Sequence, residues 1–196
     1  MTKVYVQTHG CSANSADSES MAGLLAKAGF KIVSDIEHSE VNILNICTVK
    51  GLHVPLKKIE EFTEQFSDKK LVVAGCISED IIPQIRKLNQ EASLINTHNI
   101  HRVVEAVEES LQGNVLEALT QERINKAELP KVRTNRVVGI VPIASGCADF
   151  CTYCSVKLIK GNIFSYPEDY IIKDVKKNVE QGCKEIWFTS QDNGAY

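Results

Sequence analysis

The sequence has 196 residues and a formal net charge of −3, with 43% hydrophobic and 24% charged residues. These are globular proportions, and they exclude a disordered, collagen-like or disulfide-stapled chain. The length allows one domain or two small ones. Because the chain has 22 Lys and Arg residues and 25 Asp and Glu residues, it lacks the basic surplus of a dedicated nucleic-acid binder. We therefore expect no DNA partner, and we expect any RNA contact to come from a local patch or from a part that is missing here.

The N-terminus and the cysteine content predict a cytoplasmic protein that does not enter a membrane. Residues 1–8 lack the long apolar core of a signal peptide. No apolar run approaches the roughly 18 residues that a membrane span needs. The chain has seven cysteines, and in a reducing compartment such residues serve metal sites more often than disulfides.

Short apolar runs rich in β-formers alternate with helical patterns along the first 111 residues. Strands are predicted at residues 3–8, 41–45, 71–74 and 94–96, and helices at 17–28, 55–66, 82–88 and 100–111. Repeated alternation of strand and helix predicts a parallel α/β sheet.

The C-terminal part repeats the alternation only briefly. Residues 113–131 are polar and basic and predict a connector, whose charges are either solvated or in contact with phosphates. Strands are then predicted at 137–144 and 185–189, with a helix at 170–180 between them. One and a half strand–helix units cannot close a barrel, because a barrel needs several more strands.

Cys147, Cys151 and Cys154 form a Cys-x3-Cys-x2-Cys loop. A structural zinc site needs four protein ligands, and no fourth Cys or His follows at short range. Iron–sulfur clusters typically take four thiolates, so three would leave one iron open. The alternative is three buried structural cysteines. Cys183 lies beyond a predicted helix, and we expect it only to pack.

Cys11, Cys47 and Cys76 each follow a predicted strand within two or three residues. The carboxyl ends of parallel strands share one edge of the sheet, where ligands bind. Each cysteine alone would be an ordinary small core residue. Their recurrence at equivalent positions predicts a second three-thiol site.

At these residues the sequence resembles the radical S-adenosylmethionine methylthiotransferases. Residues 146–154 are similar to the radical-generating motif of that family. Residues 8–14 with 17–19, 45–50 and 73–76 resemble the motifs of its first domain. Residues 186–196 look most like the archaeal and eukaryotic branch, which converts N6-threonylcarbamoyladenosine beside the tRNA anticodon to its 2-methylthio derivative. The chain departs from the family pattern at three positions, with Ile46 and Asn193 where Thr is usual and Lys160 where Arg is usual.

The resemblance implies three parts and two partners. These parts are a parallel-sheet α/β domain at 1–115, a linker at 116–136 and the first strands of an incomplete radical SAM TIM-type barrel at 137–196. Relatives of this family continue through the barrel into a small RNA-binding domain. We therefore expect an N-terminal fragment that makes no methylthio product alone. The implied partners are tRNA, gripped mainly by the absent regions, and a reductant protein.

The resemblance also implies two four-iron, four-sulfur clusters and S-adenosylmethionine as cofactors. Cys147, Cys151 and Cys154 would hold the catalytic cluster that binds S-adenosylmethionine, and Cys11, Cys47 and Cys76 the auxiliary cluster that presents sulfur. Tyr153 would lie near the adenine of S-adenosylmethionine, and Ser190, Gln191 and Asp192 near its amino group. Loop packing and ordinary loop polarity are the alternatives for those four residues.

Several polar residues lie close to the cysteines in the sequence or beside a predicted helix. Asn14, Asp17, Asn45 and Thr48 adjoin the N-terminal cysteines, and helix capping accounts for Asp17 equally well. His98 and His101 flank a predicted helix start, which favours surface or capping roles over metal ligation. Two other functions stay open: a methylthiotransferase that modifies a ribosomal protein side chain, and a non-catalytic zinc- or cluster-binding scaffold.

Overall fold

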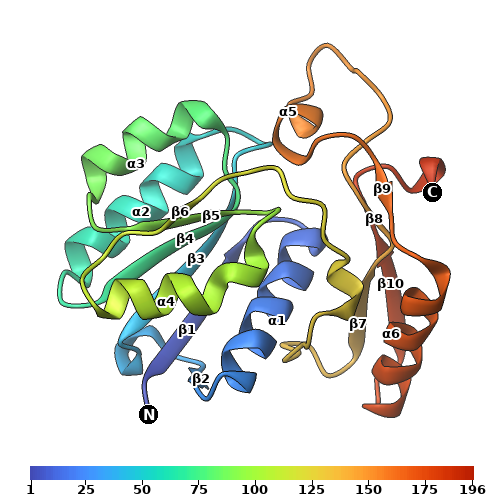
Figure 1. The fold of residues 1–196 in the computed structure, drawn as a ribbon, viewed down its shortest axis with the longest axis horizontal. Helices are drawn as coiled ribbons and strands as arrows, with labels where there is room; N and C mark the ends of the chain where they lie inside the picture. The colour runs from blue at the N-terminus through green and yellow to red at the C-terminus, as the bar shows by residue number, and fades with distance from the viewer.

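The computed structural model describes residues 1–196, which form an α/β region beside a smaller second region (Figure 1). The first region is built on a six-stranded sheet in the order β2-β1-β3-β4-β5-β6, and every pair in it is parallel. Its strands are β1 (Lys3–His9), β2 (Lys31–Val33), β3 (Val41–Cys47), β4 (Lys70–Cys76), β5 (Ser93–Asn96) and β6 (Glu117–Ala118). The predicted parallel α/β sheet is confirmed.

Helices cover both faces of this sheet. One face carries α1 (Ser12–Lys27) and α4 (Val103–Leu111), and the other carries α2 (His53–Gln65) and α3 (Ile82–Leu88). Alternation along β3 divides the core, because Val41 and Ile43 pack under α1 and α4 while Leu44 and Ile46 pack under α2 and α3. Short 3₁₀ turns lie at Ile36–His38, Glu79–Ile81, Ile100–Arg102, Lys126–Glu128 and Asn193–Ala195.

The strand order reverses at β1. The chain leaves β1 for β2 on one side and then returns past it to β3 on the other. In an open parallel sheet, the loops that follow the strands on either side of such a reversal diverge and leave a crevice at the carboxyl ends. The loops after β1 and β3 therefore border the natural ligand site of this fold.

The second region contains one parallel strand pair. It consists of β7 (Val138–Pro142) and β10 (Glu185–Thr189), joined through α6 (Glu168–Glu180). Between them lie the short pair β8 (Ala144–Ser145) and β9 (Phe164–Ser165) and the one-turn helix α5 (Val156–Lys160). Two parallel strands with a crossover helix agree with the start of a barrel, and the barrel itself stays a prediction.

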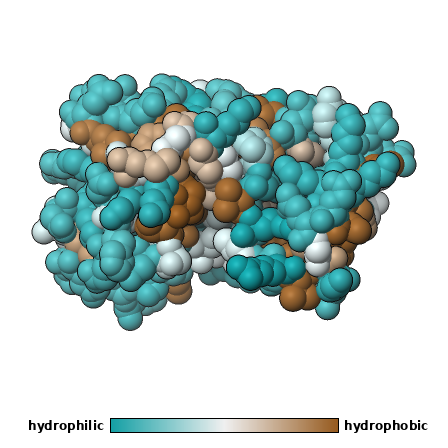
Figure 2. Space-filling view, turned by 90° about the horizontal axis from the view of Figure 1, so that it is seen from below, coloured by the Kyte–Doolittle hydropathy of each residue, from teal (hydrophilic) through white to brown (hydrophobic).

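The second region leaves large apolar side chains in contact with solvent. On β10, Trp187 is 51% exposed and Phe188 is 53% exposed, and Val179 on α6 is 57% exposed. Figure 2 shows brown surface at the right-hand end of the molecule, where Figure 1 places this region. None of the helices combines the length and the apolar character that crossing a bilayer requires.

The predicted connector is packed against the first region. Strand β6, which lies inside the segment 116–136, pairs with β5 of the first region. Lys126 is buried in an ion pair with Asp17, and Lys131 is buried in an ion pair with Asp174. A solvated linker is therefore the wrong interpretation for these two lysines. The domain limits at 115 and 136 stay a prediction.

The connector passes so close to α1 that a side chain at Gly23 would collide with it. A Cβ at Gly23 would lie 2.2 Å from the carbonyl oxygen of Pro130. One turn earlier in α1, Glu19 is 1% exposed, and its backbone carbonyl accepts a bond from Val132 N–H at 2.9 Å. Its carboxylate Oε1 accepts from the backbone N–H of Thr134 at 3.1 Å, while Oε2 has no partner. Helix α1 thereby holds the two regions together.

The free energy of unfolding of Glu19→Gln, relative to that of the unsubstituted protein, should increase as the pH rises. Burial raises the pKa of Glu19, so the folded state binds this proton more tightly than the unfolded chain does. The stability that Glu19 contributes is therefore full at low pH and is lost as the pH rises through the folded pKa. Urea unfolding of both proteins from about pH 4 to pH 8 measures the difference in the free energy of unfolding. A difference that does not change with pH would contradict this expectation.

Candidate metal centres

The three N-terminal cysteines lie at one edge of the sheet, as the sequence predicts. Cys47 and Cys76 are the last residues of the adjacent strands β3 and β4, and they are paired in register. Cys11 is the residue just before α1, two positions after the end of β1. The sheet therefore places this N-terminal cysteine set at the crevice beside the strand reversal.

A buried amide network fixes the loops that carry this set. The thiols of Cys11 and Cys76 both donate to Oδ1 of Asn14, at 3.4 and 3.9 Å. Asn14 is fully buried, and its Nδ2 donates to Oδ1 of Asn45 at 2.9 Å and to the carbonyl of Ile46 at 3.0 Å. Thr48 donates its hydroxyl to the carbonyl of Cys76 at 2.9 Å. Asn14, Asn45 and Thr48 thus hold the cysteine-bearing backbone in place.

Gly75→Ala should destabilise the fold by about 2–3 kcal/mol or more. Gly75 has a φ of +103°, where L side chains are strained, and a Cβ there would lie 2.2 Å from Oδ1 of Asn45. Gly29→Ala is the matched control, because Gly29 has a φ of +94° but open space around it, and it should cost only about 1 kcal/mol. Denaturant unfolding compares the two, and equal costs would mean that the close approach at Gly75 is relieved without consequence.

The surroundings of Cys47 favour a thiolate. A hydrogen bond from Cys76 lowers the pKa of Cys47 to about 6, and the backbone N–H groups of Val49 and Lys50 act in the same direction. The pKa of Cys76 is raised by that same bond and by burial. Because thiolates are the form that binds metal, Cys47 is ready for ligation near neutral pH.

Two buried lysines from outside the first 115 residues reach this set. Lys160, at the end of α5, is 4% exposed and lies beside Cys76. Burial opposes its charge, but the neighbouring Cys76, Asp17 and Cys11 raise the pKa of Lys160. Lys126 lies 2.8 Å from the Asp17 carboxylate, and both lysines donate to the Thr97 hydroxyl, at 3.0 Å from Lys126 and 3.3 Å from Lys160. The thiols therefore lie beside fixed positive charge.

The N-terminal cysteine set offers thiol donors of the kind that iron–sulfur clusters take. No group of three or more His, Cys, Asp or Glu side chains converges closely enough to hold one metal ion. The thiolates of an iron–sulfur cluster bind different irons and so surround a body instead of a point. Cys11 and Cys47 line a cavity of about 250 Å³ together with Gly10 and Gly51. Two of the three thiols border this space, and Cys76, which is fully buried, lies outside its lining. Sulfur donors are the ligands that an iron–sulfur cluster takes.

The loop cysteine set, Cys147, Cys151 and Cys154, lies on an open loop of the second region. Cys147 is anchored, because its Sγ lies 3.6 Å from Oδ2 of Asp192 and its backbone bridges to Asn162. Cys151 and Cys154 are exposed and joined by a turn in which Cys154 N–H donates to Cys151 O at 3.0 Å. The loop therefore presents two free thiols from one fixed end.

The other predicted site residues lie on this loop or beside it, and all of them except Gln191 make a hydrogen bond there. Tyr153 is 90% exposed, and its hydrogen bond to Cys151 raises the pKa of its hydroxyl. Asp192 also accepts from the backbone N–H of Ala148 at 3.2 Å, and its own N–H donates to Ser190 Oγ at 3.0 Å. Gln191 makes no side-chain hydrogen bond and is half-buried beside them.

Sequence reasoning missed the buried charges. Helix capping is the wrong interpretation of Asp17, because α1 begins at Ser12 and Asp17 lies inside it. Lys160 was noticeable only as a departure from the family pattern, and Lys126 as one basic residue of the connector. The two histidines serve neither cysteine set, since His98 Nε2 lies 3.1 Å from the carbonyl of Ile159 and His101 lies 3.4 Å from Glu122.

Known proteins are similar to this chain along nearly its whole length, and one family model matches its first half. The family described as "Uncharacterized protein family UPF0004" matches residues 3–97. The threonylcarbamoyladenosine tRNA methylthiotransferase of Mus musculus is 37% identical over 209 residues, covering 99% of this chain and 34% of that protein. The Drosophila melanogaster protein of the same name is 40% identical over 202 residues, covering 99% and 36%.

An archaeal protein gives a similar match. The probable threonylcarbamoyladenosine tRNA methylthiotransferase of Methanothermobacter thermautotrophicus is 37% identical over 196 residues, covering 99% of this chain and 46% of that protein. The chain thus spans between 34% and 46% of the length of these curated relatives. Along its whole length the chain is therefore similar to threonylcarbamoyladenosine tRNA methylthiotransferases, of which it spans less than half.

Proposed function

We propose that this chain carries both iron–sulfur sites of a radical SAM transferase that converts N6-threonylcarbamoyladenosine in tRNA to its 2-methylthio derivative. The observation that carries the proposal is the position of residues 189–192. The hydroxyls of Thr189 and Ser12 lie 2.7 Å apart, next to Cys11, and Asp192 contacts Cys147. One short segment at the end of β10 therefore bonds to both cysteine-bearing loops.

In this proposal each cysteine set binds one four-iron, four-sulfur cluster. Cys147, Cys151 and Cys154 would hold a cluster that would supply the electron for reductive cleavage of S-adenosylmethionine, and Cys11, Cys47 and Cys76 would hold one that would supply the sulfur.

The chain's own residues position these groups and balance their charge. Asp192 orients Cys147 and the N–H of Ala148. Lys160 places positive charge beside Cys76 and near Cys11. In the proposal, the exposed ring of Tyr153 stacks on the adenine of S-adenosylmethionine. Ser190, Gln191 and Asp192, which follow the end of β10, meet its amino group.

The proposal includes a cytoplasmic location, a tRNA substrate and a reductant protein as partner. It also includes the division into a methylthiotransferase domain at 1–115, a linker at 116–136 and the start of a barrel at 137–196. The net charge of −3 supports a tRNA grip that lies mainly outside these residues.

A product assay by mass spectrometry tests this function. The complete product of the gene and these 196 residues alone are reconstituted anaerobically, reduced, and given S-adenosylmethionine with a tRNA that contains N6-threonylcarbamoyladenosine. We expect the methylthio product on the tRNA from the complete protein, none from the 196 residues alone, and none from a Cys151→Ala variant of the complete protein. A methylthiolated ribosomal peptide without modified tRNA would instead assign the enzyme to the protein-modifying alternative.

A further inference from the structure

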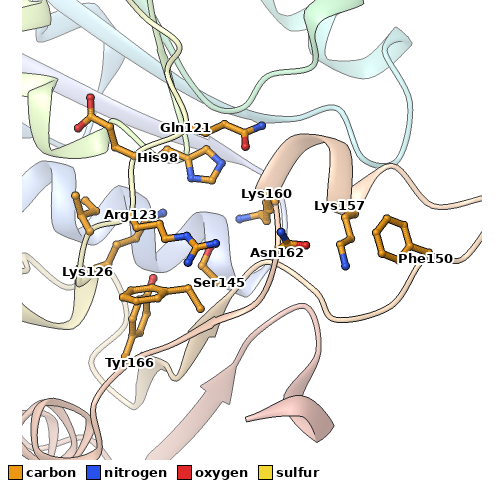
Figure 3. A pocket seen from close by; sticks show the side chains of 14 residues that line it. His98, Gln121, Arg123, Lys126, Ser145, Phe150, Lys157, Lys160, Asn162 and Tyr166 are labelled. Carbon is orange, nitrogen blue, oxygen red and sulfur yellow. The ribbon is translucent and has the colours of Figure 1, made fainter.

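A cavity of about 270 Å³ lies between the two regions and touches none of the cysteines (Figure 3). Its walls come from three parts of the chain. His98 follows β5, Gln121 and Arg123 belong to the connector, and Asn162 and Tyr166 flank β9. The cavity therefore exists only where the second region packs against the first.

The lining of this cavity is strongly cationic. Arg123 and Lys157 lie nearer solvent, while Lys126 and Lys160 are buried. The only acidic residue among the lining is Glu122, which lies 3.4 Å from His101. Beneath the lining, Asp17 supplies one negative charge for the two buried lysines. The balance leaves an excess of positive charge that attracts an anion.

Among the Lys and Arg side chains that line the cavity, Arg123 is the one without a partner in the chain. It makes no ion pair and no side-chain hydrogen bond within the chain, whereas Lys157 donates to the carbonyl of Ala148 at 2.8 Å and lies over the Phe150 ring. In Figure 3 the side chains of Arg123 and Lys160 point toward each other across the cavity. An unpaired guanidinium in a cationic cavity is a receptor for a planar anion such as a carboxylate.

The cavity also lies between the two cysteine sets. Phe150 in its wall belongs to the loop between Cys147 and Cys151, and Lys160 in its wall contacts Cys76. A group bound here is therefore held close to both.

We propose that this cavity binds the threonyl carboxylate of N6-threonylcarbamoyladenosine, with Arg123 as the residue that pairs with it. The inference rests on the proposed function. Threonine joined to the adenine through its amino group keeps a free carboxylate, which an unmodified adenosine lacks. The amides of Gln121 and Asn162 and the hydroxyl of Ser145 are polar partners for the carbamoyl and hydroxyl groups. Pairing at Arg123 thereby selects the modified adenosine over the unmodified one.

Calorimetric binding of nucleosides to the reconstituted chain tests the proposal. The probes are N6-threonylcarbamoyladenosine, its neutral methyl ester, adenosine and adenosine 5′-monophosphate. We expect the free acid to bind about tenfold or more tightly than the ester and adenosine, and Arg123→Gln to remove that preference. Arg136→Gln is the matched control, because Arg136 is an exposed arginine that follows the same connector and does not line the cavity. It should leave the preference unchanged.

Four results would overturn the proposal. Equal binding of acid and ester, or an unchanged preference in Arg123→Gln, would mean that the carboxylate does not bind in this cavity. Adenosine 5′-monophosphate binding as tightly as the free acid would assign the cavity to a phosphate. No binding of any probe, in a sample with its full iron content, would reject this site while leaving the proposed cluster function intact.

Discussion

Replacing Cys11, Cys47 and Cys76 together by Ala is expected to lower the iron content of the anaerobically reconstituted chain from about eight to about four atoms per chain. The two cysteine sets lie on different elements, and neither shares a ligand with the other. The loss of one set should therefore leave the cluster of the other in place. Iron and labile sulfide are measured together with the visible absorbance of the sample.

Cys183→Ala is the control for this experiment. Cys183 is 7% exposed and accepts a hydrogen bond from Arg133 at 2.6 Å, so it packs in the second region as the sequence predicts. Its removal should leave about eight irons. About four irons in the unsubstituted chain, with no loss on the triple substitution, would make the N-terminal cysteines packing residues. A colourless protein with one zinc per chain would support the non-catalytic scaffold.

Asp17→Asn should destabilise the folded chain by about 3–5 kcal/mol, because it leaves buried positive charge without its counterion. The side chains of Asp17 and Lys126 are 5% and 8% exposed, and Lys160 lies beside them. Burial lowers the pKa of Lys126, and the neighbouring Asp17 carboxylate opposes that shift. Urea unfolding of the chain before cluster reconstitution measures the loss.

Two further variants separate charge from packing. Asp17→Asn combined with Lys126→Met should recover much of the lost stability, since it removes one of the two unpaired charges. Arg102→Ala breaks an ion pair whose side chains are 32% and 47% exposed, and it should cost less than about 0.5 kcal/mol. If Asp17→Asn cost no more stability than Arg102→Ala, the buried charges of Asp17, Lys126 and Lys160 would contribute nothing to folding.

The sequence predicted those parts of the structure that depend on local periodicity. The alternation of apolar runs and helical patterns correctly predicts β1, β3, β4 and β5, the helices between them and the edge at which three cysteines lie. The strands run slightly further than predicted, so that Cys47 and Cys76 end β3 and β4 instead of following them. Strands β2 and β6, with 3 and 2 residues, are too short to show a period of their own.

Contacts between distant residues could not be predicted in this way. The partners Asp17 and Lys126 are 109 positions apart, and no pattern near either residue marks the pair. The sequence marks Lys160 only as a departure from the family pattern, and its burial beside Cys76 depends on how the second region packs. The cationic cavity has the same origin, because its walls are brought together only by that packing.

The dependence of the N-terminal cysteine set on Lys160 has a consequence for synthesis of the chain. All three thiols and the sheet strands that position them are complete in sequence once β5 ends at Asn96, whereas the lysine that covers Cys76 is translated only at the end of α5. Domains fold as they leave the ribosome, N-terminal part first. The nascent chain therefore passes through an interval in which folded thiols stand open to delivery of iron and sulfide. Docking of α5 then places Lys160 beside Cys76, while Cys11 and Cys47 still line a cavity.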